Sequence, residues 1–96
     1  MVIVLCYDIS TDTDGGQKRL RQVASACERY GTRVQNSVFE IDITPGDFEI
    51  LKQQLTHIID EESDSIRIYR IGKDAKRKTT IIGLKNKLEL GSPMLF

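Results

Sequence analysis

The apolar positions of this chain follow strand-like spacing in some segments and helix-like spacing in others. Residues 2–7, VIVLCY, form an unbroken apolar run rich in β-branched side chains. Such a run predicts a central strand that is covered on both faces. Within residues 17–30, apolar side chains recur every three or four positions, which is typical of the buried stripe of a helix. Gly31 is a natural end for that helix.

The middle of the chain predicts two strands and a second helix. In residues 32–43, polar and apolar positions alternate, and the QNS at residues 35–37 suits a turn or bulge between two strands. The helix that follows has favourable residue types at its start. Thr44 is a good N-cap, Pro45 fits the first helical position, and Asp47 lies beside the positive helix end.

The last third of the chain predicts one more strand and a basic segment. Isoleucines alternate with polar residues up to residue 71, and Gly72 ends this strand. Residues 73–80, KDAKRKTT, are expected to form a mobile basic loop, and residues 80–82 a short last strand. The tail at residues 85–96 ends in three apolar residues, which favours docking on a partner surface.

This order of elements predicts an α+β fold of the ferredoxin-like βαββαβ type, with an antiparallel sheet and both helices on one face. We expect a single domain over residues 1–96, in which residues 73–96 supply the basic loop and a C-terminal dimer- or partner-docking segment. Because the first strand is apolar on both sides, the sheet face without helices needs a cover. A second copy of the same sheet is the simplest cover, so we expect a homodimer through that face.

Composition narrows the class of protein. A chain of 96 residues with 40% hydrophobic and 29% charged residues is typical of one soluble globular domain. No apolar stretch is long enough to cross a membrane, and the N-terminus lacks the basic flank of a signal peptide. The two cysteines have no metal-binding spacing. They are expected to be reduced thiols in a cytoplasmic protein.

The charged residues cancel in number but are sorted along the chain. Residues 17–36 hold five basic residues and one acidic residue, residues 40–64 hold eight acidic and one basic, and residues 65–87 hold eight basic and one acidic. Sorting of this kind can place a basic surface beside an acidic one, and a basic surface attracts phosphate. Composition alone leaves open both nucleic-acid binding and simple solvated faces.

Three carboxylates, those of Asp8, Asp12 and Asp14, follow the first predicted strand. Residues 10–15, STDTDG, begin like an EF-hand loop, but Arg21 stands where such a loop needs a bidentate glutamate. A cation there repels calcium, which excludes this site. The nearby glycine pair fits no phosphate-binding motif. Asp12 and Asp14 are therefore interpreted as loop acids near a helix N-terminus.

Asp8 is different because it ends a core strand, where a carboxylate needs a cation. The candidates are Arg19, Arg33 and a metal ion. One carboxylate is a poor magnesium site, since phosphoryl hydrolysis usually uses at least two acids. In a dimer, two Asp8 side chains could meet near the axis and share one Mg²⁺ ion. A salt bridge from Asp8 to a basic residue stays open as the alternative.

Three stretches resemble one known family. They are YDIS at residues 7–10, GGQKRLRQVASACERYGTRVQNSVFE at residues 15–40 and DSIRIYRIG at residues 64–72. Together they resemble the Cas2 family of CRISPR-associated adaptation proteins, and the resemblance covers residues 2–71. It implies a ferredoxin-like homodimer that assembles with the integrase Cas1 in spacer acquisition. It also implies a magnesium-dependent endonuclease acting on single-stranded RNA or double-stranded DNA.

The resemblance implies roles for individual residues. The metal-binding and catalytic aspartate falls on Asp8, the neighbouring catalytic tyrosine on Tyr7, and a downstream hydroxyl residue on Ser10. The positions implicated in nucleic-acid contact fall on Arg19, Arg21, Arg33 and Phe39.

Two functional hypotheses therefore stay open. The first is a phosphodiesterase in which the paired Asp8 carboxylates hold one Mg²⁺ ion. The second is a non-catalytic dimeric scaffold that grips the backbone of DNA in the spacer-integration complex. A ferredoxin-like module that binds a small regulatory molecule fits the fold, but it explains neither basic cluster.

Overall fold

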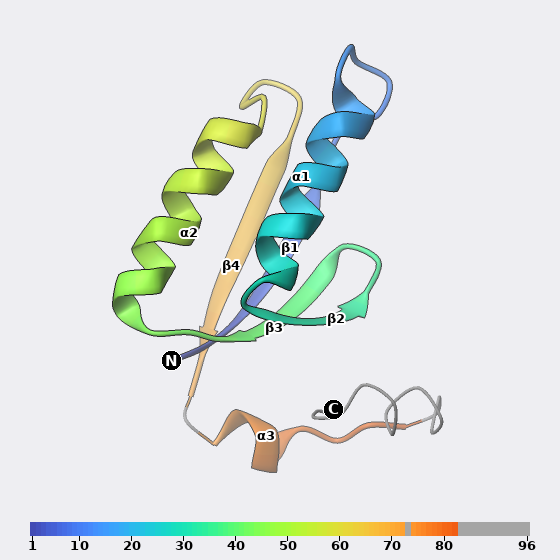
Figure 1. Ribbon diagram of the computed structural model, residues 1–96. Helices are drawn as coiled ribbons and strands as arrows, with labels where there is room; N and C mark the ends of the chain where they lie inside the picture. Colours follow the sequence, from blue (N-terminus) through green and yellow to red (C-terminus); the bar gives the residue numbers. More distant parts are fainter. Residues whose placement is uncertain (73, 83–96) are drawn as a thin grey trace.

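The computed structural model describes residues 1–72 and 74–82. The elements follow one another in the order shown in Figure 1: β1 (Val2–Asp8), α1 (Gly16–Glu28), β2 (Gly31–Gln35), β3 (Val38–Asp42), α2 (Pro45–Ile58), β4 (Ser65–Ile71) and the short α3 (Ala75–Lys78). The predicted docking tail at residues 85–96 lies outside the described residues, so its role stays a prediction.

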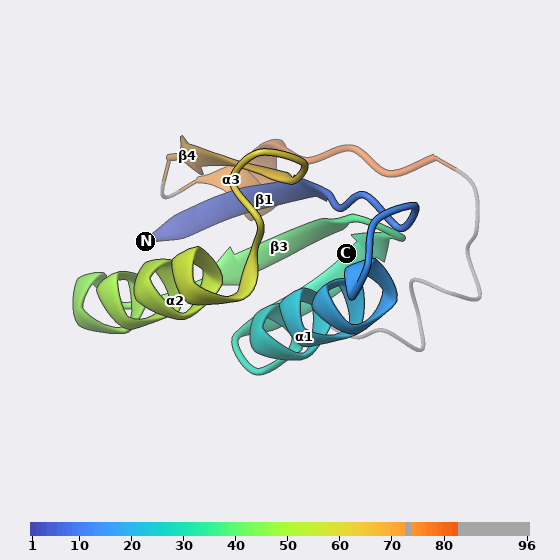
Figure 2. The same ribbon diagram turned by 90° about the horizontal axis from the view of Figure 1, so that it is seen from above.

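The four strands form one sheet in the order β2-β3-β1-β4, and each neighbouring pair is antiparallel. Figure 2 shows α1 and α2 side by side on the same face of this sheet. The structure thus confirms the predicted α+β, ferredoxin-like arrangement. Both α1 and α2 lie on one face, and no helix of the described residues covers the other face of the sheet. We call this other face the open face.

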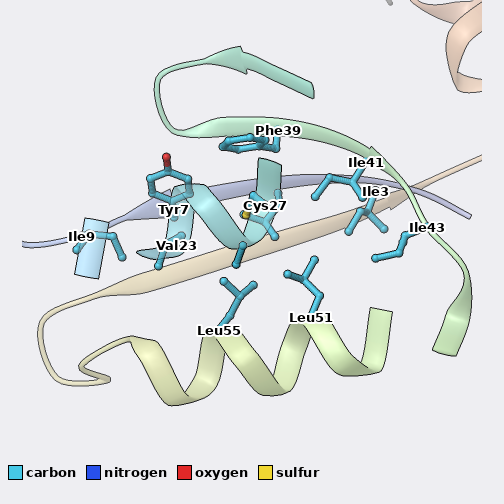
Figure 3. Packing of buried hydrophobic residues seen from close by; sticks show 12 residues of the cluster. Ile3, Tyr7, Ile9, Val23, Cys27, Phe39, Ile41, Ile43, Leu51 and Leu55 are labelled. Atoms are coloured by element: carbon cyan, nitrogen blue, oxygen red, sulfur yellow. The ribbon is translucent and has the colours of Figure 1, made fainter. Parts of the chain in front are cut away.

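The hydrophobic core lies between the sheet and the two helices. On β1, the side chains of Ile3, Leu5 and Tyr7 are buried toward the helices, while Val2, Val4 and Cys6 on the open face are only half-buried. One chain thus covers β1 on the helical side, and the expected cover of its other face by a second copy stays a prediction. Figure 3 shows the core, whose other main members are Phe39, Ile41, Val23, Cys27, Leu51 and Leu55.

Local sequence signals explain the element boundaries. The hairpin turn falls at residues 36–37, and the pairing of β2 with β3 shifts register between Arg33 and Gln35. The predicted turn is therefore confirmed, and the register shift lies directly before it. At the start of α2, the Thr44 Oγ1 accepts a hydrogen bond from the Asp47 backbone N–H at 3.2 Å, as its N-cap role requires.

Two predictions near the end of the described residues are wrong. The segment expected to be a basic loop contains the helical turn α3, in which the Lys78 N–H donates to the Asp74 carbonyl oxygen and Arg77 pairs with the Asp74 carboxylate at 3.0 Å. Lysine, arginine and alanine favour a helix once such a turn closes. Residues 80–82 form no strand with any other part of the chain that the structure describes. No helix within residues 1–72 or 74–82 is long and apolar enough to cross a membrane.

Candidate functional site

Asp8 is the last residue of β1, and its exposed side chain lies on the open face of the sheet. In the β1–β4 register, Asp8 lies opposite Ser65, which is also exposed. The two cations considered as its partners are engaged elsewhere, Arg19 with Asp64 and Arg33 with Glu28. Within residues 1–72 and 74–82, the Asp8 carboxylate makes no ion pair or hydrogen bond. It is therefore available to a ligand or to a second chain.

Tyr7 lies on the opposite face of β1 from Asp8, because successive side chains of a strand alternate. Its ring is buried beside Phe39 (Figure 3), and the two ring centroids are 6.2 Å apart. Its hydroxyl donates a hydrogen bond to the Asn36 carbonyl oxygen at 3.0 Å. Burial raises the pKa of Tyr7 above its ordinary value. The structure does not bring the Tyr7 hydroxyl beside the Asp8 carboxylate.

Ser10 belongs to the loop that joins β1 to α1, and its backbone is held by several hydrogen bonds. Its N–H donates to Asp64 Oδ1 at 2.9 Å. Its carbonyl oxygen accepts from the Thr13 hydroxyl and from the Arg19 guanidinium, each at 3.3 Å. These bonds fix the position of the loop backbone immediately after Asp8.

The centre of this network is Asp64, a buried carboxylate that the sequence reasoning missed. It accepts hydrogen bonds from Arg19 Nε at 2.7 Å, from the Ser10 N–H at 2.9 Å and from the Asp60 N–H at 2.9 Å. Burial by itself would raise the pKa of Asp64, but these three donors together outweigh it and lower the pKa to about 2. The only sequence signal was an acid directly before the last predicted strand, at the end of an acidic run.

Two glycines allow the loop to lie close to the start of α1. Gly15 has φ of 78°, a left-handed conformation that glycine adopts without strain. A Cβ atom on Gly16 would overlap the Ser10 carbonyl oxygen. The glycine pair therefore serves backbone geometry. Asp12 and Asp14 lie exposed in the same loop.

The residues expected to contact nucleic acid have different surroundings. Phe39 is 0% exposed in the core, and the Arg19 side chain is only 14% exposed in its ion pair with Asp64. Arg33 lies over the Phe39 ring at 5.3 Å and pairs with Glu28 at 3.5 Å. Arg21 is exposed on α1 and makes no ion pair with any described residue. Among these four, Arg21 is the side chain that presents an unpaired charge to solvent.

A metal ion needs more ligands than one copy of the described residues supplies. These residues contain no group of three His, Cys, Asp or Glu side chains that could hold an ion. The exposed Asp8 carboxylate has the hard oxygen atoms that Mg²⁺ prefers, and Mg²⁺ usually keeps several waters beside one or two carboxylates. Asp8 thus fits a magnesium site as one of its carboxylate ligands.

Comparison of the sequence with known proteins gives a consistent result. The family model described as CRISPR associated protein Cas2 matches residues 1–79. The CRISPR-associated endonuclease Cas2 of Halalkalibacterium halodurans is 49% identical over 96 residues, which cover 100% of both chains. The CRISPR-associated endoribonuclease Cas2 1 of Moorella thermoacetica is 44% identical over 95 residues, which cover 99% of each chain.

Solved structures with the same fold lead to the same family. The crystal structure of Streptococcus pyogenes Cas2 at pH 6.5 superposes with a TM-score of 0.77 at 51% identity, covering 86% of this chain and 100% of that chain. A chain of a partial Cas6-RT-Cas1–Cas2 complex superposes with a TM-score of 0.65 at 29% identity, covering 84% of this chain and 89% of that chain.

Proposed function

Because the chain belongs to the Cas2 family of CRISPR-associated proteins, we propose that it acts in CRISPR adaptation as a nucleic-acid-binding partner of a Cas1 integrase and cleaves phosphodiester bonds. Relatives that cover its full length are named endonuclease and endoribonuclease, and a structural neighbour comes from a complex that contains Cas1. The observation that carries the catalytic part is the Asp8 carboxylate, exposed and unpaired among the described residues at the end of a core strand.

The proposed active form is a homodimer through the open face. That face is partly apolar, since Val2, Val4 and Cys6 are half-buried on it, and Tyr69 and Ile71 are 50% and 36% exposed. Burying this area against a second copy is favourable because apolar surface leaves water. It would also bring together two Asp8 side chains, the two carboxylates that one Mg²⁺ ion needs.

The positions of Asp8, Ser65 and Arg21 suggest a role for each of them in this site. The two Asp8 carboxylates would hold the ion, and Ser65, opposite Asp8 in the register, supplies a hydroxyl on the same face. Bound Mg²⁺ would supply polarisation of the scissile phosphate and a more acidic water. Arg21 would neutralise phosphate charge at a distance from the cleaved bond. Single-stranded RNA and double-stranded DNA are the proposed substrates.

Asp8→Asn tests the catalytic part, because the amide keeps the size of the side chain but loses its charge. We expect cleavage of single-stranded RNA and duplex DNA in Mg²⁺ to fall to background, while the mass in solution stays that of a dimer. Asp12→Asn is the matched control, since Asp12 is an exposed acid four residues further along the same segment. Cleavage that survives Asp8→Asn, or that survives EDTA, would contradict the proposal.

A non-catalytic scaffold is the alternative function, and a specific observation favours it. Each chain offers one exposed carboxylate at this site, while Tyr7 is buried and the Ser10 backbone is fixed by Asp64 and Arg19. Under this alternative, Asp8→Asn leaves Cas1-dependent spacer integration at the wild-type level. Running nuclease and integration assays on the same variant separates the two functions.

A further inference from the structure

A groove of about 780 Å³ lies between α1 and α2, on the helical side of the molecule. Three cations line one side of it: Lys18 and Arg21 of α1, and Arg29 at the C-cap of that helix. Its other polar lining residues include Gln22 from α1 and Gln54 and His57 from α2. No acidic residue lines this groove. The groove is therefore an open basic channel with amide and imidazole groups in it.

The three cations have no acidic partner among the described residues. Lys18, Arg21 and Arg29 make no ion pair or hydrogen bond with the side chains that the structure describes, and each is exposed. Acidic partners are present for four other cations, Arg19, Arg33, Lys52 and Arg77. Outside the groove, Arg67, Arg70 and Lys78 also make no ion pair with a described residue. Three cations without an ion-pair partner among the described residues thus lie together along this groove.

The spacing of the cations follows from the geometry of α1. They lie on the side of the helix opposite the buried residues Val23 and Cys27. Lys18 and Arg29 are eleven positions apart, which at the α-helical rise corresponds to about 16 Å. Because one strand of duplex DNA carries a phosphate every ~3.4 Å along the axis, this length matches roughly five phosphates.

We propose that the groove between α1 and α2 binds the phosphate backbone of a nucleic acid, with Lys18, Arg21 and Arg29 as its charged contacts. Gln22, Gln54 and His57 add side-chain hydrogen bonds to phosphate or sugar oxygens, and such contacts position a strand without selecting its sequence. The inference rests on the proposed nucleic-acid binding and assigns a place to it. Of the residues it uses, only Arg21 was expected from the sequence to contact nucleic acid.

The place of the groove has a consequence for the function. The helices α1 and α2 cover one face of the sheet (Figure 2). Asp8 lies on the other face, because side chains alternate along β1 and its neighbour Tyr7 is buried toward the helices. A backbone segment held in the groove is therefore a different segment from one whose bond is cleaved at Asp8. Binding through the groove and cleavage at Asp8 are separable by mutation.

The test uses a triple variant, Lys18→Gln, Arg21→Gln and Arg29→Gln, in the full-length protein. Its control is Lys52→Gln, Arg77→Gln and Lys78→Gln, which removes the same number of positive charges outside the groove. Two of these cations, Lys52 and Arg77, are ion-paired in the wild type. Binding to a fluorescent duplex DNA is measured between about 50 and 200 mM salt, since each lost phosphate contact lowers the salt slope by about 0.9. Thermal unfolding checks that both variants fold, and Arg29→Gln alone is the fallback variant.

We expect the groove variant to bind at least about tenfold more weakly and to have a salt slope lower by about 2.7, while the control keeps most of the wild-type slope. An equal effect of the control variant, or an unchanged slope in the groove variant, would overturn the groove assignment. So would a groove variant that loses affinity for polyglutamate but not for DNA, since that result assigns the groove to an acidic protein segment. A wild-type protein that binds no nucleic acid would instead overturn the proposed function itself.

Discussion

The Asp64 carboxylate holds together three parts of the chain that are far apart in sequence. It bonds to the loop after Asp8 through the Ser10 N–H, to α1 through Arg19, and to the turn before β4 through the Asp60 N–H. Its side chain is 0% exposed. Replacing it with asparagine keeps the shape of the side chain but removes the charge, and it turns one acceptor atom into a donor that faces N–H groups.

The loss of folding stability caused by Asp64→Asn can be estimated in two ways. Removing one partner of a buried ion pair costs about 3–5 kcal/mol, and because the Arg19 side chain stays partly exposed, solvent screening reduces this to about 2–3 kcal/mol. The lowering of the Asp64 pKa from 3.8 to about 2 corresponds to about 2 kcal/mol before the same screening. We therefore expect Asp64→Asn to lower the free energy of unfolding by about 2 kcal/mol, and the melting temperature by about 10 °C.

Urea unfolding followed by circular dichroism measures this loss at neutral pH. Asp12→Asn is the matched control, because Asp12 is exposed in the loop and its replacement should change stability by less than about 0.5 kcal/mol. An Asp64→Asn variant as stable as that control would refute the account of Asp64 as the anchor of the loop. Cleavage and DNA binding measured on the folded variant show whether the loop position also matters for Asp8.

The dependence on pH gives an independent check. Because the folded pKa of Asp64 lies below its unfolded value, the ionic stabilisation is fully present above about pH 4 and is lost as the pH falls through about 2. The stability gap between wild type and Asp64→Asn should therefore narrow over that window. A gap that stays constant down to pH 2 would contradict the ionic explanation.

Two further predictions concern buried residues. Burial raises the pKa of Cys27 to about 12, so iodoacetamide at pH 8 should alkylate it only after unfolding in urea; mass spectrometry of the digested protein checks this, and modification of the native protein would refute it. Tyr7→Phe removes the hydrogen bond to the Asn36 carbonyl oxygen, so we expect a loss of about 1 kcal/mol in urea unfolding with cleavage unchanged. A folded Tyr7→Phe variant without nuclease activity would show that the hydroxyl acts in the reaction.

The fold was predictable because its signals are local. The apolar spacing of α1, the alternation along β3 and β4, and the Thr44 cap each depend on a few neighbouring residues, and each element is present close to where the sequence indicated. Residues 75–78 were missed because a single helical turn has no apolar periodicity to detect. What covers the open face of β1 could not be predicted in detail, because an apolar run does not show which neighbours lie against it.

The site was less predictable because its key contacts are distant in sequence. Arg19 and Asp64 are 45 positions apart, and no pattern in the chain links them. Arg19 and Arg21 belong to one basic stretch of α1, yet the first is held in an ion pair and the second is exposed. Residue type makes both arginines candidates for nucleic-acid contact. Only their contacts in three dimensions show that Arg19 fixes the loop and that Arg21 faces solvent.

The position of Asp8 along its strand limits how the proposed dimer can work. Asp8 is the last residue of β1, so it lies at the end of the open face, whereas Val4 lies in the middle of the strand. In a face-to-face dimer the middle of each face is buried most completely, because an interface has a buried core and a solvent-accessible rim. A carboxylate at the end of the strand can approach its copy and still be reached from the rim of the interface. A nuclease of this design therefore needs a dimer whose two strand ends lie close together, and a dimer that keeps them apart would leave each Asp8 a single ligand, which favours the scaffold function.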